Sequence, residues 1–329
     1  MNILVTGGAG YIGSHTVHTL RAKGYGLVVL DNLSKGHVQA VPDDVPLIQG
    51  DIRDRTLLER TLTEYAVQAV VHFAADSLVG ESMAKPSLYY HNNVAATLAL
   101  LDGMRAAGVS RIVFSSTAAV YGEPERQPIT EDMPTAPTNV YGRTKLIIEG
   151  MLHDFAMAYG LTYVSLRYFN AAGALPSGKI GEDHSPESHL IPLVLKTALG
   201  QRGAIDVYGT DYATPDGTCI RDYIHVTDLA EAHALAVRHL LDGGRSRIYN
   251  LGSEHGFSVR QVIDTAKDVT GLDFAVRETS RRAGDPAVLV ASSERIRTEL
   301  GWQPTKSALP EIIADAWRWH KGHLRGFGS

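Results

Sequence analysis

The chain has 329 residues, of which 44% are hydrophobic and 20% are charged, and this length favours two lobes because single cores stop growing at ~250–300 residues. Its formal net charge of −5 disfavours a nucleic-acid-binding protein. The single cysteine, Cys219, excludes an internal disulfide, and no stretch has the pattern of a signal peptide or the ~18 apolar residues of a membrane span. We therefore expect a cytoplasmic protein with no membrane partner.

The first half of the chain alternates short apolar runs with longer helical patterns. Strands are expected at residues 3–6, 27–30, 47–48, 69–73, 111–115 and 163–167. Helices are expected at residues 14–23, 55–64, 93–107 and 141–159. This alternation predicts right-handed βαβ crossovers and an α/β fold with a doubly wound parallel sheet of the Rossmann type.

Beyond residue 170 the pattern changes. Residues 174–222 are rich in Gly, Pro and Ser and are expected to form loops over a ligand site. Three further helices are expected. The first spans 227–241 and is capped by Thr227 or Asp228, the second begins after a capping box at Ser258, and the third spans about 309–320. The sequence predicts two domains. Residues 1–170 form a nucleotide-binding domain, and residues 171–329 form a smaller mixed α/β lobe. Part of the segment 222–252 is expected to pack back onto the first domain.

A glycine-rich turn lies between the first predicted strand and the first predicted helix. Gly8, Gly10 and Gly13 form a G-x-G-x-x-G pattern, and Gly7 precedes them. These glycines allow the backbone to approach a pyrophosphate closely, and the helix N-terminus stabilises the anion. The next strand ends at Asp31, where an acid binds the adenosine ribose hydroxyls and repels a 2′-phosphate. The pattern therefore predicts NAD rather than NADP.

Tyr141 and Lys145 stand at i and i+4 of a predicted helix and so share one face. We expect the ammonium to lower the pKa of the phenol from ~10 toward working pH, so that the phenol can remove and return a proton on a substrate hydroxyl. Ser115 and Thr117, at the end of a predicted strand, supply hydroxyls at the same sheet edge. Together with the dinucleotide site, this pair predicts catalysis.

The glycine turn, Asp31, the Ser/Thr strand end and the Tyr141/Lys145 pair resemble the extended short-chain dehydrogenase/reductases. More narrowly, the chain resembles the UDP-glucose 4-epimerases along nearly its whole length. The segments that carry this resemblance are Asp31-Asn32-Leu33, Gly50-Asp51-Ile52-Arg53, His72-Phe73-Ala74-Ala75, Val79-Gly80-Glu81-Ser82, Tyr89-Tyr90-His91-Asn92-Asn93, Leu166-Arg167-Tyr168-Phe169-Asn170, Asp216-Gly217-Thr218, Arg221-Asp222-Tyr223-Ile224-His225-Val226, Tyr249-Asn250-Leu251-Gly252 and Arg281-Arg282-Ala283-Gly284-Asp285.

This resemblance implies NAD as cofactor, a UDP-sugar as substrate, a homodimer, and Tyr141, Lys145 and Thr117 as catalytic residues. The residues implied to contact NAD are Gly7, Gly10, Tyr11, Ile12, Gly13, Asp31, Asn32, Leu33, Ser34, Lys35, Gly36, Asp51, Ile52, Phe73, Ala74, Ala75, Asn92, Ser115, Tyr141, Lys145 and Phe169. The residues implied to bind the UDP-sugar are Thr117, Tyr141, Asn170, Tyr208 (stacked on uracil), Arg221, Arg282, Asp285 and Leu289.

The activity implied is epimerisation at C4, which interconverts UDP-galactose and UDP-glucose through a transient 4-keto sugar. Leu289 stands where strictly hexose-specific members carry tyrosine, which suggests that N-acetylated UDP-hexosamines are also accepted. Thr117 replaces the serine of the best-known members and keeps the hydroxyl. Asp76-Ser77 replaces a Leu-Lys pair of some members, which removes a cationic cofactor contact and leaves the role of Ser77 open.

Several alternatives stay open at this point. Other UDP-sugar 4-epimerases, acting on UDP-glucuronate or UDP-pentoses, share the same features. A non-catalytic NAD(H)-sensing Rossmann protein is the alternative of another class, but such proteins typically lack the tyrosine, whereas Tyr141 and Lys145 are intact here. A 4,6-dehydratase is disfavoured because Ala118-Ala119 supply no acids. Acids and histidines also gather at Glu182-Asp183-His184 and Glu187-Ser188-His189. They show no helical i, i+4 spacing like that of metal-binding HExxH motifs, so we expect a polar substrate loop and no metal site there.

Overall fold

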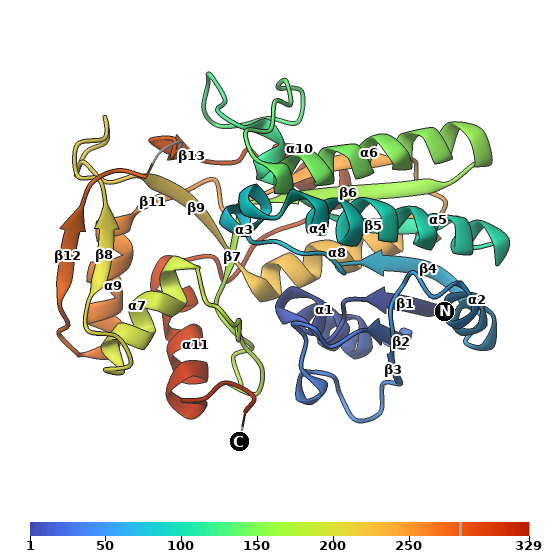
Figure 1. Ribbon diagram of the computed structural model, residues 1–329, viewed down its shortest axis with the longest axis horizontal. Helices are drawn as coiled ribbons and strands as arrows, with labels where there is room; N and C mark the ends of the chain where they lie inside the picture. The colour runs from blue at the N-terminus through green and yellow to red at the C-terminus, as the bar shows by residue number, and fades with distance from the viewer. Residues whose placement is uncertain (283–284, 329) are drawn as a thin grey trace.

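A seven-stranded parallel sheet forms the larger part of the molecule (Figure 1), whose computed structural model describes residues 1–282 and 285–328. The strand order is β10-β6-β5-β4-β1-β2-β3. Because β2 and β4 flank β1 on opposite sides, the chain leaves the carboxyl end of β1 at the switch point where such sheets bind ligands. The strands are β1 (Asn2–Thr6), β2 (Gly26–Asp31), β3 (Leu47–Gln49), β4 (Val67–His72), β5 (Arg111–Thr117), β6 (Thr162–Tyr168) and β10 (Arg247–Leu251).

Apolar side chains on both faces of these strands are covered by helices, as expected of a buried parallel sheet. Ile3 and Val5 belong to a core shared with one group of helices, whereas Leu4 belongs to a second core on the opposite face. The first group is α1 (Tyr11–Ala22) and α8 (Val226–Leu241), and the second is α2 (Arg55–Glu64), α5 (Ala96–Ala106) and α6 (Val140–Tyr159).

Short elements surround the carboxyl edge of the sheet. They include Tyr90–Ala95, a π-helical turn (η2) that leads into α5. The others are η1 (Val38–Ala40), α3 (Val79–Ala84), α4 (Pro86–Tyr89) and η3 (Ala118–Tyr121).

The second lobe lies beyond this edge and is built around β9 (Ile220–His225), which pairs with three short strands (Figure 1). Those strands are β7 (Asn170–Ala172), β11 (Gly256–Ser258) and β13 (Val288–Leu289). A separate pair of strands and three helices complete the lobe: β8 (Ile205–Tyr208), β12 (Val276–Thr279), α7 (Leu190–Ala198), α9 (Val259–Thr270) and α11 (Leu309–Gly322). Helix α10 (Glu294–Leu300) packs instead against β10 and α8 of the first domain.

The predicted α/β class with a doubly wound parallel sheet is confirmed. So is the capping box, because the Ser258 hydroxyl accepts the Gln261 N–H at 3.1 Å and the Gln261 side chain accepts the Ser258 N–H at 2.8 Å. The predicted cap of α8 is wrong, since the His225 ring accepts the Thr227 N–H while the Asp228 carboxylate accepts N–H groups of a distant loop. The domain boundary at residue 170 stays a prediction, and the structure places β10 in the first sheet.

Within the described residues, no helix combines the length and the apolar character needed to cross a membrane.

Candidate active site

A cavity of about 530 Å³ opens at the carboxyl ends of the parallel strands. Its walls come from the glycine turn after β1, the ends of β2 and β4, the end of β5, the first turn of α6 and the loops of the second lobe. It therefore joins the predicted dinucleotide site to the predicted catalytic residues.

The glycine turn has the shape that a bound pyrophosphate requires. Gly7 has a φ of +71°, and a Cβ there would lie 2.5 Å from the backbone nitrogen of Ala74. A Cβ on Gly13 would lie 2.2 Å from the Gly7 carbonyl oxygen. Helix α1 begins after Gly10 with no side-chain cap, so its first N–H groups are available to an anion. This cradle fits a dinucleotide.

Asp31 ends β2 beside that turn. Its carboxylate accepts the Ala9 N–H at 3.0 Å and the Leu33 N–H at 2.8 Å, which fixes its orientation toward the cavity wall. Burial raises the pKa of Asp31, and these two backbone hydrogen bonds act against the shift. Except for Leu33, every residue predicted to contact NAD lines the cavity, whereas Leu33 packs against the core of the first domain.

Asn92 reaches the cavity from the π-helical turn η2. Its side-chain amide donates to a carboxylate oxygen of Asp76 at 2.7 Å. The Asp76 N–H in turn donates to Asn93 at 2.8 Å, and Ser77 also lines the cavity. Asp76 thus accepts a hydrogen bond from the amide that the resemblance assigns to the cofactor, and Ser77 stands where the resemblance places the lysine of some members.

Tyr141, Lys145 and Thr117 come together where β5 meets α6. Asn139 caps α6 by accepting the Gly142 N–H at 2.8 Å. A Cβ on Gly142 would lie 2.5 Å from the Ala119 carbonyl oxygen, so glycine lets the first turn of α6 approach the end of β5 closely. As a result the Tyr141 phenol and the Thr117 hydroxyl lie close together at the cavity wall.

The pKa of the Tyr141 phenol differs from the expectation. Burial raises it to about 12, although the hydrogen bond with Thr117 acts in the opposite direction. The predicted lowering by Lys145 is absent because burial also lowers the pKa of Lys145 to about 7. In addition, the Lys145 amine donates to the Ser115 carbonyl oxygen at 2.8 Å, and it lies 5.9 Å from the centre of the Tyr141 ring. In the protein alone, the phenol is therefore held protonated.

A buried polar network, which the sequence did not indicate, supports this strand end. Glu149 of α6 accepts two hydrogen bonds from the Arg167 guanidinium, at 2.9 and 2.6 Å, and one from the Ser116 hydroxyl at 2.6 Å. Arg167 also donates to the Tyr121 hydroxyl, which donates to Asn250. The only signal in the sequence is a charged residue in the middle of an apolar strand.

A second cavity of about 210 Å³ lies in the smaller lobe. Asn170, Arg221 and Asp285 line both cavities, whereas Tyr208 and Arg282 line only the second. The residues predicted to bind a UDP-sugar are therefore distributed over two adjacent cavities that share part of their walls, with the predicted catalytic residues in the first.

Two arginines converge on Asp285. Arg282 pairs with its carboxylate at 2.9 Å, and Arg221 approaches it at 3.6 Å. The Arg282 guanidinium also lies 4.8 Å from the centre of the half-exposed Tyr208 ring. Planar guanidinium groups suit a diphosphate because they form bidentate hydrogen bonds. Residues 283–284, which belong to the same sequence motif, lie outside the described residues.

Leu289 and the segment 182–189 complete the cavity wall. Leu289 lies in β13 and packs against a small apolar cluster that contains Tyr121. Glu182, His184 and His189 line the first cavity. The sequence spacing of these acids and histidines did not predict their convergence in space.

Comparison with known proteins identifies the class. Residues 3–252 match the model of the NAD dependent epimerase/dehydratase family, so the chain belongs to that family. It is 56% identical, over 329 residues, to the UDP-glucose 4-epimerase of Halalkalibacterium halodurans, a match that covers 100% of this chain and 98% of the relative. The sequence-based resemblance is thereby confirmed.

Two solved structures are similar over almost the whole chain. The UDP-glucose 4-epimerase of Brucella ovis in complex with NAD is 50% identical with a TM-score of 0.94, covering 96% of this chain and 97% of that one. The enzyme of Bifidobacterium longum in complex with NAD⁺ and UDP is 40% identical, also with a TM-score of 0.94, covering 99% and 100%.

Proposed function

We propose that the protein is an NAD-dependent isomerase that interconverts UDP-galactose and UDP-glucose by epimerisation at C4. One observation carries this proposal: the Tyr141 phenol, in contact with Thr117, lies in the cavity that begins at the dinucleotide-binding glycine turn and shares Arg221 and Asp285 with the second cavity. A sugar C4 hydroxyl bound there faces a proton-transferring group, and its nucleotide extends toward the second lobe.

The glycine turn and Asp31 would hold NAD⁺, which would supply a reversible hydride acceptor for C4 of the sugar. The chain's own contribution is proton transfer. Tyr141 takes the proton from the C4 hydroxyl as the 4-keto sugar forms, and it returns the proton when C4 is reduced on the opposite face. Thr117, whose hydroxyl lies beside the phenol, positions the C4 hydroxyl.

The nucleotide part of the substrate holds the intermediate. Arg221 and Arg282 bind the diphosphate, Asn170 supports it, and Tyr208 stacks on the uracil ring. These contacts are remote from C4, so they retain the 4-keto sugar while it turns between two orientations. The Asp285 carboxylate keeps both guanidinium groups aligned before substrate binds.

Two further properties belong to the proposal. The protein forms a homodimer through α5 and α6, which lie side by side on one face of the sheet (Figure 1). It acts in the cytoplasm, which fits its single cysteine, a buried thiol with no partner for a disulfide within the chain.

The substrate range includes N-acetylated UDP-hexosamines, because Leu289 leaves more space beside the sugar C2 substituent than a tyrosine would. We expect Leu289→Tyr to reduce kcat/KM for UDP-N-acetylgalactosamine at least tenfold more than for UDP-galactose, as ~1.4 kcal/mol of selective crowding would. Steady-state kinetics with both substrates measure this ratio. Absence of acetylated turnover in the unsubstituted protein would reject the wider range.

The experiment that tests the proposed function follows the hydrogen at C4. Purified protein is incubated with UDP-galactose carrying deuterium at C4, and the products are analysed by NMR. We expect UDP-glucose with the deuterium retained at C4. Loss of the label to solvent, a deoxygenated 4-keto product, or conversion of UDP-glucuronate or UDP-pentoses alone would contradict the proposal.

A further inference from the structure

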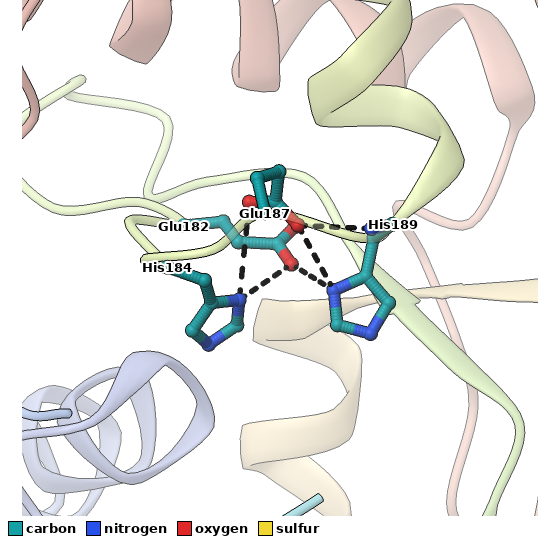
Figure 2. Close-up of side chains that lie close together, drawn as sticks. All are labelled: Glu182, His184, Glu187 and His189. Carbon is teal, nitrogen blue, oxygen red and sulfur yellow. Dashed lines mark hydrogen bonds and ion pairs between the residues drawn. The ribbon is translucent and has the colours of Figure 1, made fainter. Parts of the chain in front are cut away.

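Four acidic and imidazole side chains meet between the first domain and α7. They are Glu182, His184, Glu187 and His189, and Figure 2 shows their polar ends pointing toward one another. One ligand atom from each lies within 4.8 Å of all the others. We propose that this cluster is a divalent metal site, with Zn²⁺ as its occupant and a structural role. The proposal does not depend on the proposed function.

The separations of the four ligand atoms lie on both sides of the spacing around one small cation, so small side-chain adjustments would admit the ion. The Nδ1 of His184 lies 3.2 Å from a Glu182 oxygen and 3.9 Å from a Glu187 oxygen, and the Nδ1 of His189 lies 2.6 and 3.4 Å from the same two carboxylates. Tetrahedral Zn²⁺ with bonds of ~2.0–2.1 Å separates its ligand atoms by ~3.3 Å. Two imidazoles and two carboxylates are ligands that zinc accepts.

The cluster lacks the hydrogen bonds that would satisfy it without an ion. Within the part of the chain that the structure describes, a Glu182 oxygen, a Glu187 oxygen and the His184 Nδ1 are buried with no hydrogen-bond partner. The two carboxylate side chains are only 3% and 4% exposed. Buried polar atoms are normally hydrogen-bonded, so three such atoms that make only ion-pair contacts with one another point to a partner that all of them could share.

Charge leads to the same conclusion. Among the described residues, Glu182 and Glu187 form ion pairs only with these two histidines, and with no lysine or arginine. Metal ligation uses neutral imidazoles, so with an ion bound the two buried carboxylates would match the charge of one divalent cation.

The position of the cluster explains what the metal would do. His184 lies edge-on to Tyr11, the first residue of α1, and the neighbouring Ser185 carbonyl accepts a hydrogen bond from Lys35 at 2.9 Å. His189 directly precedes α7 and lines both cavities. A bound ion would therefore fix the segment 182–189 against the glycine turn and hold the wall that the two cavities share.

The test measures metal binding directly on the full-length protein purified without a polyhistidine tag. By inductively coupled plasma mass spectrometry we expect about one zinc per chain, and less than about a tenth in the double variant His184→Ala/His189→Ala. His153→Ala, which removes an exposed histidine of α6, is the matched control and keeps its zinc. A double variant that retains the zinc of the unsubstituted protein would overturn the site.

A second measurement does not rely on the variant's folding. After chelator treatment, Zn²⁺ at ~100 times its Kd is expected to raise the Tm of the unsubstituted protein by about 4 °C. Co²⁺ in its place is expected to give the visible absorption of tetrahedral cobalt. If Zn²⁺, Mn²⁺ and Co²⁺ leave both the Tm and the spectrum unchanged, the cluster is an ion-paired set of histidines and glutamates and the proposal fails.

Discussion

The Tyr141 phenol and the Lys145 amine are buried together, and burial moves their pKa values in opposite directions, to about 12 and about 7. Both shifts favour the neutral forms, because burial disfavours charge in each case. In the protein alone, the phenol is therefore protonated and the amine loses its charge as the pH rises above about 7. An acid–base role requires that bound ligands stabilise the phenolate.

Tyr141→Phe tests the acid–base role. We expect kcat for UDP-galactose to fall at least ~100-fold, because the variant loses the group that moves the C4 hydroxyl proton. NAD content should be unchanged, since the glycine turn and Asp31 are intact. Steady-state kinetics and cofactor extraction measure the two effects. Tyr159→Phe, on an exposed tyrosine of the same helix, is the control, and near-normal turnover in Tyr141→Phe would remove the phenol from the mechanism.

Lys145 predicts a pH dependence of stability in the cofactor-free protein. In the unfolded chain the amine keeps its proton up to ~10.4, whereas in the folded protein it loses the proton above about 7. The unfolded state thus binds more protons, so this group makes stability rise with pH, by up to ~1.4 kcal/mol per pH unit. Urea unfolding at pH 7 and 9 should show a larger rise than in Lys145→Met; parallel changes in the two proteins would contradict the lowered pKa.

At the scale of elements, the Glu149–Arg167 pair ties α6 to β6 and, through Ser116, to β5. The two side chains are only 4% and 5% exposed. Because β5 ends at Thr117 and α6 begins beside Tyr141, this pair fixes the two elements that carry the proposed proton transfer.

Glu149→Gln is expected to lower the free energy of unfolding by ~3–5 kcal/mol, since it leaves the Arg167 guanidinium buried without its counter-charge. Urea denaturation monitored by circular dichroism measures the loss. Glu59→Gln breaks an exposed pair with Arg55 and should leave the midpoint unchanged. A Glu149→Gln midpoint equal to that of the control would show that the buried pair does not hold the elements together.

The elements that the sequence predicted share a local cause. The strands at 3–6, 27–30 and 111–115 were visible because uninterrupted apolar runs must be buried on both sheet faces. β10 lacks such a run, since Asn250 interrupts it and makes its hydrogen bonds with distant residues. The π-helical start of the 93–107 helix and the His225 cap of α8 also depend on tertiary contacts that a local pattern does not contain.

The site divides in the same way. Gly7, Asp31, Tyr141 and Lys145 were predictable because each belongs to a compact motif with a physical reason for its spacing. The raised pKa of Tyr141 was not, because it depends on burial rather than on the nearby charge. Nor was the cluster of Glu182 and its neighbours, which a loop without helical periodicity brings together.

At the scale of the whole molecule, α5 and α6 present a face that a second copy would cover. Leu98 and Ile147 are 43% and 37% exposed on these helices, and Met157 is 77% exposed. We expect Leu98→Lys/Ile147→Lys to shift the protein from dimer to monomer in size-exclusion chromatography with light scattering. Leu272→Lys, on an exposed leucine of the other lobe, should stay dimeric. A monomeric unsubstituted protein at micromolar concentration would refute the proposed interface.

The central claim is that the chain carries its own redox cofactor and uses it without net oxidation. The most direct measurement incubates the purified protein with UDP-galactose, adds no NAD, and follows UDP-glucose by NMR. We expect product from co-purified cofactor, with no accumulation of a keto sugar. If no UDP-glucose forms, either without added NAD or with NAD supplied, UDP-galactose is not the substrate. Membership of the family and the dinucleotide-binding fold would still stand.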